Sequence, residues 1–406
     1  MCRQWLVASA LAVVITAYGA TELTPDSIAD YSMMECGCES VVIPATARYV
    51  GTGAFAGSPS LKEVIIEGSE TRLMPYAFSG CQALERVICR ACSITERCFS
   101  RCESLKTLVM GDSVKEIGDG AFAGCLQLSE VEFPETIERI GRDAFAHSGL
   151  ETIDLSSTAI TGLSDEAFAG CGNLCEVRLP AGLVQMGEKV FFGDTSLVVV
   201  EMPALASVPA LAFACASRLT DLSAPLGEGL GEIGDFAFAG LRDVKVLQMP
   251  SSLSYIGVGA FERTMSLDTI ECRSLEAVPS LGSEVWAGVN CAQVSLLASE
   301  EMAPLFASAP QWSSFAITRT TSGGGISADP IENIECRFEG AMLLFRAMRP
   351  LRQVKVFDIE GRLVGRWSGT GDSAEGSVDT SRTENPFFII EFSSAGGGRS
   401  TMKLRR

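Results

Sequence analysis

Cysteine is the residue type in this chain that most readily suggests metal or redox chemistry. The sequence holds 15 cysteines, and four of them crowd into one short stretch in the manner of a zinc site, namely Cys89, Cys92, Cys98 and Cys102. A second set stands three residues after successive phenylalanines: Cys81, Cys102, Cys125 and Cys171. Ser58 and Asp194 stand at the same place in other copies, three residues after Phe55 and Phe191. We therefore interpret this place in the repeat as a small buried position, and we expect no metal and no cofactor. The sequence leaves open a local disulfide that pairs Cys36 or Cys92 with a neighbour.

Acid–base catalysis has few candidate residues here. His147 is the only histidine, so a triad of nucleophile, histidine and acid would have to use it. It stands where neighbouring copies of a repeated pattern have glycine, which predicts an exposed turn residue. The 50 acidic residues allow many carboxylate pairs of the glycosidase type, but nothing singles one pair out. We therefore expect a protein that is not an enzyme; an enzyme with a site not visible in the sequence is the lesser alternative.

Charge and the N-terminus limit the compartment and the partners. The net charge of −18 argues against nucleic acid, because phosphate binding requires a basic surface. Residues 1–20 place one arginine before a short apolar run that ends in small residues, which predicts a secretory signal peptide. No other stretch reaches the length of a membrane span. We expect a secreted or outer-surface protein with no transmembrane segment in the mature chain.

Aromatic residues recur along most of the chain with a period of about 23 residues. A leucine or valine follows most of them six residues later, and an aliphatic residue nine residues later. Near Leu150 both positions arrive one residue early. The recurring aromatics are Phe55, Phe78, Phe99, Phe122, Phe145, Phe168, Phe191, Phe213, Phe238, Phe261 and Trp286.

Each copy reads as one coil of a solenoid. The pattern L-x-x-V-x-h predicts a short strand with alternate residues pointing inward, and the A-F-x-G-C segment turns the chain back toward the next strand. One coil cannot bury its apolar face alone, whereas stacked coils share a continuous core. The sequence therefore predicts a solenoid of short parallel strands over residues 41–318, preceded by a lead-in or cap at 21–40.

These copies resemble the BspA-type leucine-rich repeat family, whose repeats are similar to IGxxAFxGCxxLxxVxLP. The segment from Gly118 through Cys125 to Pro134 follows that pattern closely, and Leu305 to Phe315 resembles the closing cap of bacterial members. The resemblance implies a curved solenoid on a secreted or surface protein, usually assigned to adhesion, without catalytic residues.

The tail forms a separate module. A glycine- and serine-rich linker at residues 319–330 ends the repeat, and residues 331–406 hold 12 basic and 10 acidic residues, unlike the acidic remainder. Strand-like runs at 341–346, 353–359, 363–367 and 387–392 predict a small antiparallel β-sandwich.

The tail also resembles the C-terminal sorting domain of type IX secretion substrates. The match lies in Val354 to Asp358, in Gly361 to Val364 and in the basic end of the chain. It implies a sorting signal that includes Gly361, Lys403, Arg405 and Arg406, read by the secretion machinery. The alternative is an accessory β-domain without a sorting role.

The outward positions of the strands are the candidate binding surface. Ten residues past each aromatic, the early copies hold Ile65, Ile88 and Val109, and the later ones hold mostly acids, among them Glu132, Asp154, Glu201 and Glu271. Exposed apolar patches often mark interfaces, and solenoid sheets serve as extended binding surfaces. The alternative is a plain solvated face whose aliphatic residues are covered by residues 21–40.

We therefore expect a non-enzymatic surface protein that binds an extracellular protein or glycan through its repeat sheet. A structural spacer of the cell envelope without a specific ligand is the alternative.

Overall fold

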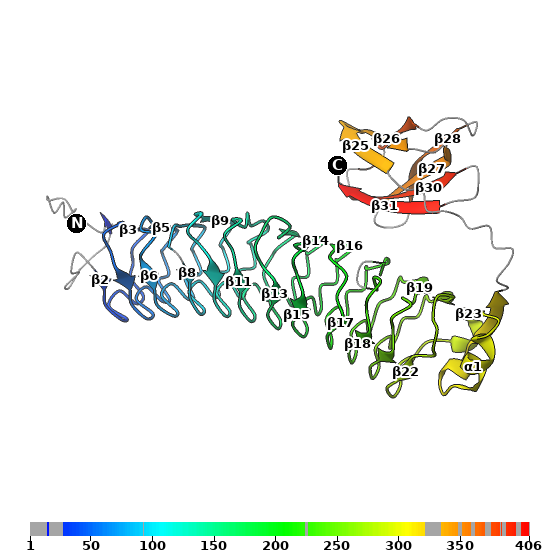
Figure 1. Cartoon of the computed structure of the whole chain (residues 1–406). Helices are drawn as coiled ribbons and strands as arrows, with labels where there is room; N and C mark the ends of the chain where they lie inside the picture. The colour runs from blue at the N-terminus through cyan, green and yellow to red at the C-terminus, as the bar shows by residue number, and fades with distance from the viewer. Residues whose placement is uncertain are drawn as a thin grey trace. The chain divides into compact units, whose positions relative to one another are not determined.

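The computed structural model describes residues 14–15, 27–91, 93–223, 226–320, 334–347, 351–358, 362–369, 375–381, 383, 387–394 and 399–405. The chain divides into two compact units, Met1–Thr320 and Thr321–Arg406. The predicted signal peptide lies outside the described residues except for β1 (Val14–Ile15), and the predicted linker lies outside them after Thr320. The first unit is a solenoid of parallel strands, which confirms the predicted fold (Figure 1).

The strands that follow each aromatic residue pair side by side from coil to coil. Strand β1 joins the first sheet antiparallel to β3, and every other pairing in this ladder is parallel. Two coils, around residues 128–133 and 219–223, have no strand at this place, so the ladder is divided into three sheets. The sheets are β3 (Ser40–Ile43), β5 (Glu63–Ile66), β7 (Arg86–Cys89) and β9 (Thr107–Met110); β12 (Thr152–Asp154), β14 (Glu176–Arg178) and β16 (Val199–Glu201); and β19 (Val246–Gln248), β21 (Thr269–Cys272), β23 (Ser295–Ser299) and β24 (Ala316–Thr320).

A second ladder of two-residue strands runs along the other side of each coil. Its residues alternate between one that faces outward and one that is buried, as in Ile117 and Ile140. The strands are β2 (Ser27–Ile28), β4 (Tyr49–Val50), β6 (Arg72–Leu73), β8 (Ser93–Ile94), β10 (Glu116–Ile117), β11 (Arg139–Ile140), β13 (Gly162–Leu163), β15 (Gln185–Met186), β17 (Ser207–Val208), β18 (Glu232–Ile233), β20 (Tyr255–Ile256) and β22 (Ser280–Leu281).

The recurring aromatics stack into one continuous column in the core. Neighbouring rings from Phe55 to Trp286 lie 5.1–5.9 Å apart, with interplanar angles of 1–21°. All of them are buried. This column explains the strict spacing in the sequence, because a missing ring would leave a cavity between two coils.

The glycine that stands four residues before most of the recurring aromatics has a steric reason. The carboxylate of Asp119 accepts a hydrogen bond from the backbone N–H of Arg142 in the next coil at 3.0 Å. A Cβ at Gly141 would stand 2.6 Å from the backbone nitrogen of Asp119. Asp165 and Gly187 repeat the arrangement, with the N–H of Glu188 as donor at 3.0 Å. The pair of aspartate and glycine therefore adds a hydrogen bond between adjacent coils where it occurs.

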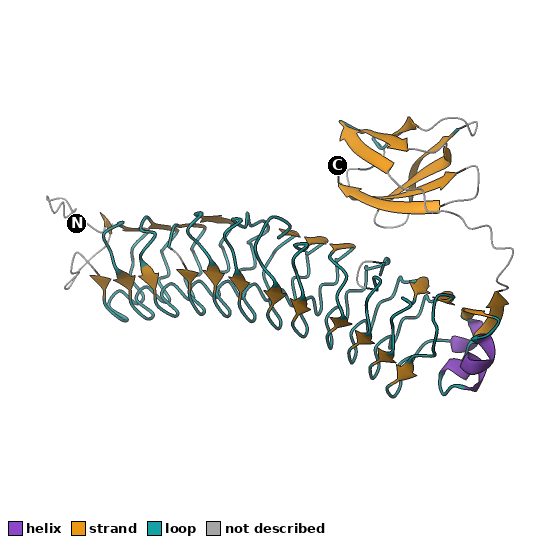
Figure 2. Ribbon diagram, viewed as in Figure 1, coloured by secondary structure: helices purple, strands orange, loops and turns teal. Residues whose placement is uncertain are grey.

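A short helical segment closes the solenoid. It comprises η1 (Cys291–Gln293), α1 (Ala303–Ser308) and η2 (Trp312–Ser314), which are the helices among the described residues (Figure 2). The side chain of Gln311 accepts a hydrogen bond from Val285 N–H at 3.0 Å and donates to the carbonyl of Gly282 at 2.7 Å. Trp312 donates its indole N–H to the carbonyl of Pro279 at 3.0 Å. Side chains of the cap thus satisfy backbone groups that a further coil would otherwise pair.

The second unit consists of two antiparallel sheets with a core of their own. One sheet orders β25 (Ile334–Glu339), β26 (Met342–Ala347) and β29 (Glu375–Asp379); the other orders β28 (Leu363–Ser368), β27 (Leu351–Asp358), β30 (Phe387–Ser394) and β31 (Arg399–Arg405). Leu343, Val354, Val356 and Ile390 are among its fully buried residues. An independent core is what a separately folding module requires.

Candidate functional site

Four aliphatic side chains lie next to one another on the outward face of the first sheet. Strand pairing aligns Val42 with Ile65, Ile65 with Ile88, and Ile88 with Val109. Val42, Ile65 and Ile88 are half-buried, and Val109 is 46% exposed. We call these four residues the apolar strip. The sequence predicted three of them; Val42 was missed because its coil has Met33 in place of the recurring phenylalanine.

Exposed ion pairs border the apolar strip. Lys62 pairs with Glu39 at 3.5 Å, Arg86 with Glu63 at 3.4 Å, and Lys106 with Glu85 at 3.6 Å. Each such pair contributes little to stability because water screens it. The pairs leave the surroundings of the strip with balanced charge, so the strip itself is the distinctive feature of this face.

Two of the acidic residues predicted on later coils, Asp154 and Glu201, lie beside one arginine. Strand pairing aligns Asp154, Arg178 and Glu201. The guanidinium of Arg178 lies 2.7 Å from Glu176, 3.2 Å from Glu201 and 3.8 Å from Asp154. Burial opposes ionisation of Asp154, but hydrogen bonds from Ser156 and the charge of Arg178 lower its pKa overall. This part of the face is therefore less negative than its carboxylates alone suggest.

The two remaining predicted acids lie apart from this cluster. Glu132 is exposed on a coil where no strand forms. Glu271 lies in β21, where its carboxylate is 3.5 Å from the amide nitrogen of Gln248 and 4.0 Å from Arg273. The structure thus places Glu132, Glu271 and the Arg178 cluster at three separate places along the solenoid.

The recurring cysteines occupy one buried position between coils. Their Sγ atoms donate to the carbonyl of the recurring phenylalanine in the preceding copy, at 3.2 Å for Cys81 and at 3.3 Å for Cys102, Cys125 and Cys171. Burial raises the pKa of Cys125 and of Cys171 to about 12. The thiols of Cys125 and Cys171 therefore stay protonated at neutral pH, whereas the hydrogen bond with Cys102 lowers the pKa of Cys81.

The stretch that suggested a zinc quartet has the same buried character. Cys89 and Cys98 are fully buried, and Cys92 lies outside the described residues. Within the described ranges, no group of three or more histidines, cysteines or acids could hold a metal ion. Cys36 and Cys38 form a disulfide, as one of the open alternatives predicts.

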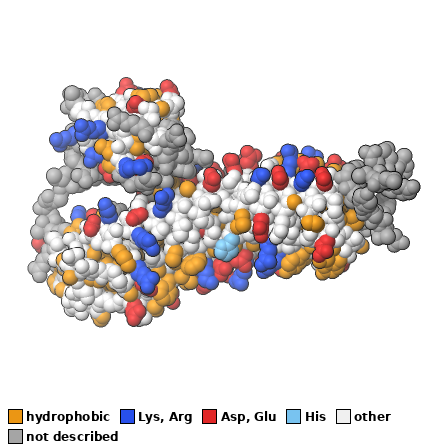
Figure 3. All heavy atoms as spheres, turned by 180° about the vertical axis from the view of Figure 1, so that it is seen from behind, with side chains coloured by type: hydrophobic (Ala, Val, Ile, Leu, Met, Phe, Trp, Pro, Cys, Tyr) orange, Lys and Arg blue, Asp and Glu red, His pale blue; other side chains and the backbone are white. Residues whose placement is uncertain are grey.

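His147 lies in an exposed turn. Its φ of 56° is the left-handed conformation that glycine supplies in neighbouring copies, such as Gly124 (75°) and Gly170 (73°). Its N–H donates to the carbonyl of Ala169 at 2.8 Å, and its ring packs where a Cβ of Gly170 would stand. The histidine side chain is visible at the surface in Figure 3.

The residues proposed as a sorting signal are only partly described. Gly361 and Arg406 lie outside the described residues, while Lys403 and Arg405 belong to β31, where their backbones pair with Ile389 and Phe387 of β30. In the adjacent hairpin, the buried carboxylate of Asp358 accepts hydrogen bonds from the N–H of Arg362 at 2.9 Å and from its Nε at 2.8 Å.

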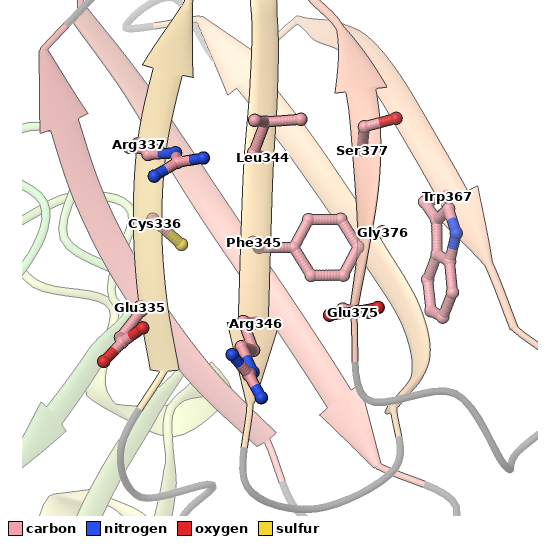
Figure 4. A pocket seen from close by; sticks show the side chains of 10 residues that line it. All are labelled: Glu335, Cys336, Arg337, Leu344, Phe345, Arg346, Trp367, Glu375, Gly376 and Ser377. Atoms are coloured by element: carbon pink, nitrogen blue, oxygen red, sulfur yellow. The ribbon is translucent and has the colours of Figure 1, made fainter.

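A hollow of about 680 Å³ lies within the second unit, beside β25, β26 and β29 (Figure 4). Phe345 and Trp367 meet edge to face at 5.2 Å on one side of it. Burial raises the pKa of the neighbouring Cys336 to about 11, so this thiol is not a ready nucleophile. The charged residues at its rim alternate in sign across the strands, in the order Glu335, Arg346, Glu375.

No helix of the described residues is long and apolar enough to cross a bilayer.

Comparison with known proteins agrees with this architecture. The family model described as the BspA type leucine-rich repeat region matches residues 26–93, 92–219 and 206–301. No match was found among curated proteins.

Three solved structures are similar to parts of this chain. A leucine-rich repeat protein from Bacteroides ovatus is 21% identical, covers 76% of this chain and 90% of its own, and has a TM-score of 0.48. A leucine-rich cell surface protein from Faecalibacterium prausnitzii is 23% identical, with coverages of 63% and 85% and a TM-score of 0.37. The leucine-rich repeat protein of T. pallidum is 30% identical over 42% of this chain and 82% of its own, with a TM-score of 0.38. The family model spans well over half of the residues, and the chain therefore belongs to the BspA-type leucine-rich repeat family.

Proposed function

We propose that this chain is a non-enzymatic protein of the cell surface that holds a macromolecular partner against the outward face of its repeat sheet. The observation that carries the proposal is the apolar strip, in which Val42, Ile65, Ile88 and Val109 align across four adjacent strands. A row of aliphatic side chains that keeps part of its surface in water is costly to solvate unless a partner covers it.

The shape of the strip favours a macromolecule over a small ligand. Small-molecule sites are concave and enclose most of their ligand. The strip instead lies on the face of a parallel sheet that continues from coil to coil, and such faces provide extended contact areas. The balanced ion pairs at its border fit the polar rim that surrounds the apolar centre of many interfaces.

Two matched substitutions test the proposal. Val109 and Val246 lie on outward positions of different sheets and are each 46% exposed. A pull-down with the full chain against extracellular matrix proteins and bacterial surface polymers should identify a partner that Val109→Glu loses and Val246→Glu retains. If both variants capture every partner as the wild type does, the strip is not the contact surface. Absence of any specific partner would favour the spacer role instead.

We further propose that the second unit directs export by the type IX route and attachment at the outer surface. Its independent core supports this proposal, since a sorting domain must fold and be read separately from its cargo. Strand β31 of this unit carries Lys403 and Arg405. A secretion receptor could recognise a strand with basic residues of this kind.

Deletion of residues 331–406 tests the sorting role. The first unit has its own core and cap, so the truncated chain should fold. It should accumulate in the periplasm, whereas the full chain reaches the surface; cell fractionation and blotting for the repeat unit distinguish the two. Equal surface display of both forms would reject the sorting role and leave the β-sandwich as an accessory domain.

A further inference from the structure

The turn that precedes each aromatic residue forms another exposed surface, separate from the repeat sheet. In the first three coils its left-handed position is held by Tyr31 (φ 54°), Gly53 (57°) and Tyr76 (62°). Each of the three donates its N–H to a carbonyl of the following coil, at 2.9, 3.1 and 3.0 Å. The two tyrosines are therefore fixed to a hydrogen-bonded ladder and stand two coils apart, about 10 Å at the usual strand spacing.

The glycine between the two tyrosines gives the first ring its place. A Cβ on Gly53 would stand 2.6 Å from Cε1 and 2.7 Å from Cδ1 of Tyr31. The ring of Tyr31 thus rests on the backbone of the next coil, yet the residue is 60% exposed, and Tyr76 is 39% exposed. One face of the Tyr31 ring is supported by the backbone, and the other face is open to solvent. Such a ring offers a flat surface for stacking and does not project far enough to insert into a partner's pocket.

The coils that hold the tyrosines also carry exposed methionines and carboxylates. Met34 and Met74 are exposed in the same coils, and Figure 3 shows hydrophobic side chains gathered along the lower edge of the solenoid near its N-terminal end. Asp30 is held beside Tyr31 by accepting a hydrogen bond from Thr52 N–H at 2.7 Å. The hydroxyl of Tyr76 lies 3.4 Å from the carboxylate of Glu96.

This combination matches the chemistry of a sugar. The electron-rich face of an aromatic ring attracts the polarised C–H bonds on the flat side of a pyranose. Ionised carboxylates accept hydrogen bonds from the hydroxyls around its edge. Two rings on one straight ladder can contact alternate sugars of an extended β-linked chain, because every second sugar presents the same side.

The charge of these coils makes other planar or cationic ligands less suitable. Residues 27–100 hold six basic and eight acidic side chains, a net charge of only −2. A basic peptide would gain little from this balance, particularly since Arg97 follows Tyr76 in the same ladder and lies 3.8 Å from Glu96. Nucleic-acid bases would also stack on tyrosine, but no basic surface accompanies these rings to neutralise phosphates.

We propose that the turn surface around Tyr31 and Tyr76 is a binding site for a neutral, extended glycan. The site is distinct from the apolar strip, which faces outward from the repeat sheet, so the two surfaces can be tested independently.

Titration of the full chain with cellohexaose, N-acetylchitohexaose and mannohexaose tests the site by calorimetry. At least one of them should bind, and Tyr31→Ala should weaken that binding about tenfold, the loss of one stacking contact of about 1.4 kcal/mol. Tyr31→Phe keeps the ring and should bind as the wild type does. Tyr255→Ala changes a tyrosine of a distant coil on β20, and Val109→Glu changes the apolar strip; neither should affect glycan binding.

Three results would overturn the glycan site. One is the absence of binding by all three oligosaccharides to a wild-type chain that melts cooperatively. Another is binding that survives the double change Tyr31→Ala and Tyr76→Ala. The third is binding of an arginine-rich peptide at the same tyrosines in preference to every oligosaccharide, which would assign the surface to a cationic partner.

Discussion

Phe145→Ala removes one ring from the aromatic column of the solenoid. Phe145 is fully buried between Phe122 and Phe168, whose ring centroids lie 5.3 and 5.6 Å away, and it meets Phe133 edge to face at 5.6 Å. Truncating a buried phenylalanine costs about 3–5 kcal/mol through lost transfer energy and the cavity that remains. Because three aromatic contacts are lost together, we expect a value near the upper end of that range.

The exposed Phe192 provides a matched control. It is 39% exposed, so Phe192→Ala should cost about 1 kcal/mol or less. Urea titration followed by circular dichroism gives both free energies of unfolding. Amide hydrogen exchange should show that the damage in Phe145→Ala concentrates in residues 122–168, because each coil contacts only its neighbours. Unchanged exchange there, or equal costs for the two variants, would refute the stacked-column reasoning.

Three further substitutions test electrostatics and the cap. Burial raises the pKa of Asp194 well above its usual range, so the free energy of unfolding of the wild type should fall as pH rises above about 4. The variant Asp194→Ser should not show that fall and should be more stable than the wild type at pH 7. A hydrogen bond from Lys189 lowers the pKa of Glu166, so this pair should stabilise the fold at pH values above the unfolded pKa of glutamate. Acidification should remove this stabilisation. Glu166→Gln should abolish the pH dependence of stability that comes from the pair, and high salt should weaken that dependence. Gln311→Ala leaves Val285 N–H without its side-chain acceptor and should cost about 1–3 kcal/mol, with faster hydrogen exchange confined to the last coils. Urea titrations at pH 3.5 and pH 7 check the first two, and a neutral-pH titration with hydrogen exchange checks the third.

The repeat made most of the first unit predictable from sequence. Aromatic residues at a fixed interval indicate stacked coils of a solenoid. In the copy that contains Leu150 the strand comes one residue early in the sequence, and the pairing of Ile153 with Val177 agrees with that shift. The sandwich of the second unit was also predicted, but three of its strands were missed. In β29 only Val378 is buried, and β31 is largely polar, so neither shows a hydrophobic run.

The interactions of the candidate surface could not be predicted in the same way. The column that contains Asp154, Arg178 and Glu201 follows from the period, but the bridging of three carboxylates by Arg178 depends on side-chain geometry. The interruption of the sheet at residues 128–133 likewise gave no signal, since Leu128 and Val131 fit the pattern of their neighbours. The period of the repeat therefore predicts which residues are aligned from coil to coil. It does not predict whether their backbones form a hydrogen-bonded sheet, because that depends on local backbone geometry.

Hydrogen exchange of the full chain with a captured partner bound tests the central proposal most directly. Binding to the apolar strip should slow amide exchange in β5, β7 and β9 and leave β19 and β21 unchanged. The exchange should return to that of the free protein when Val109→Glu is mixed with the same partner. Protection that falls on β19 and β21 while β5, β7 and β9 exchange freely would contradict the proposal and place the binding surface at the other end of the solenoid.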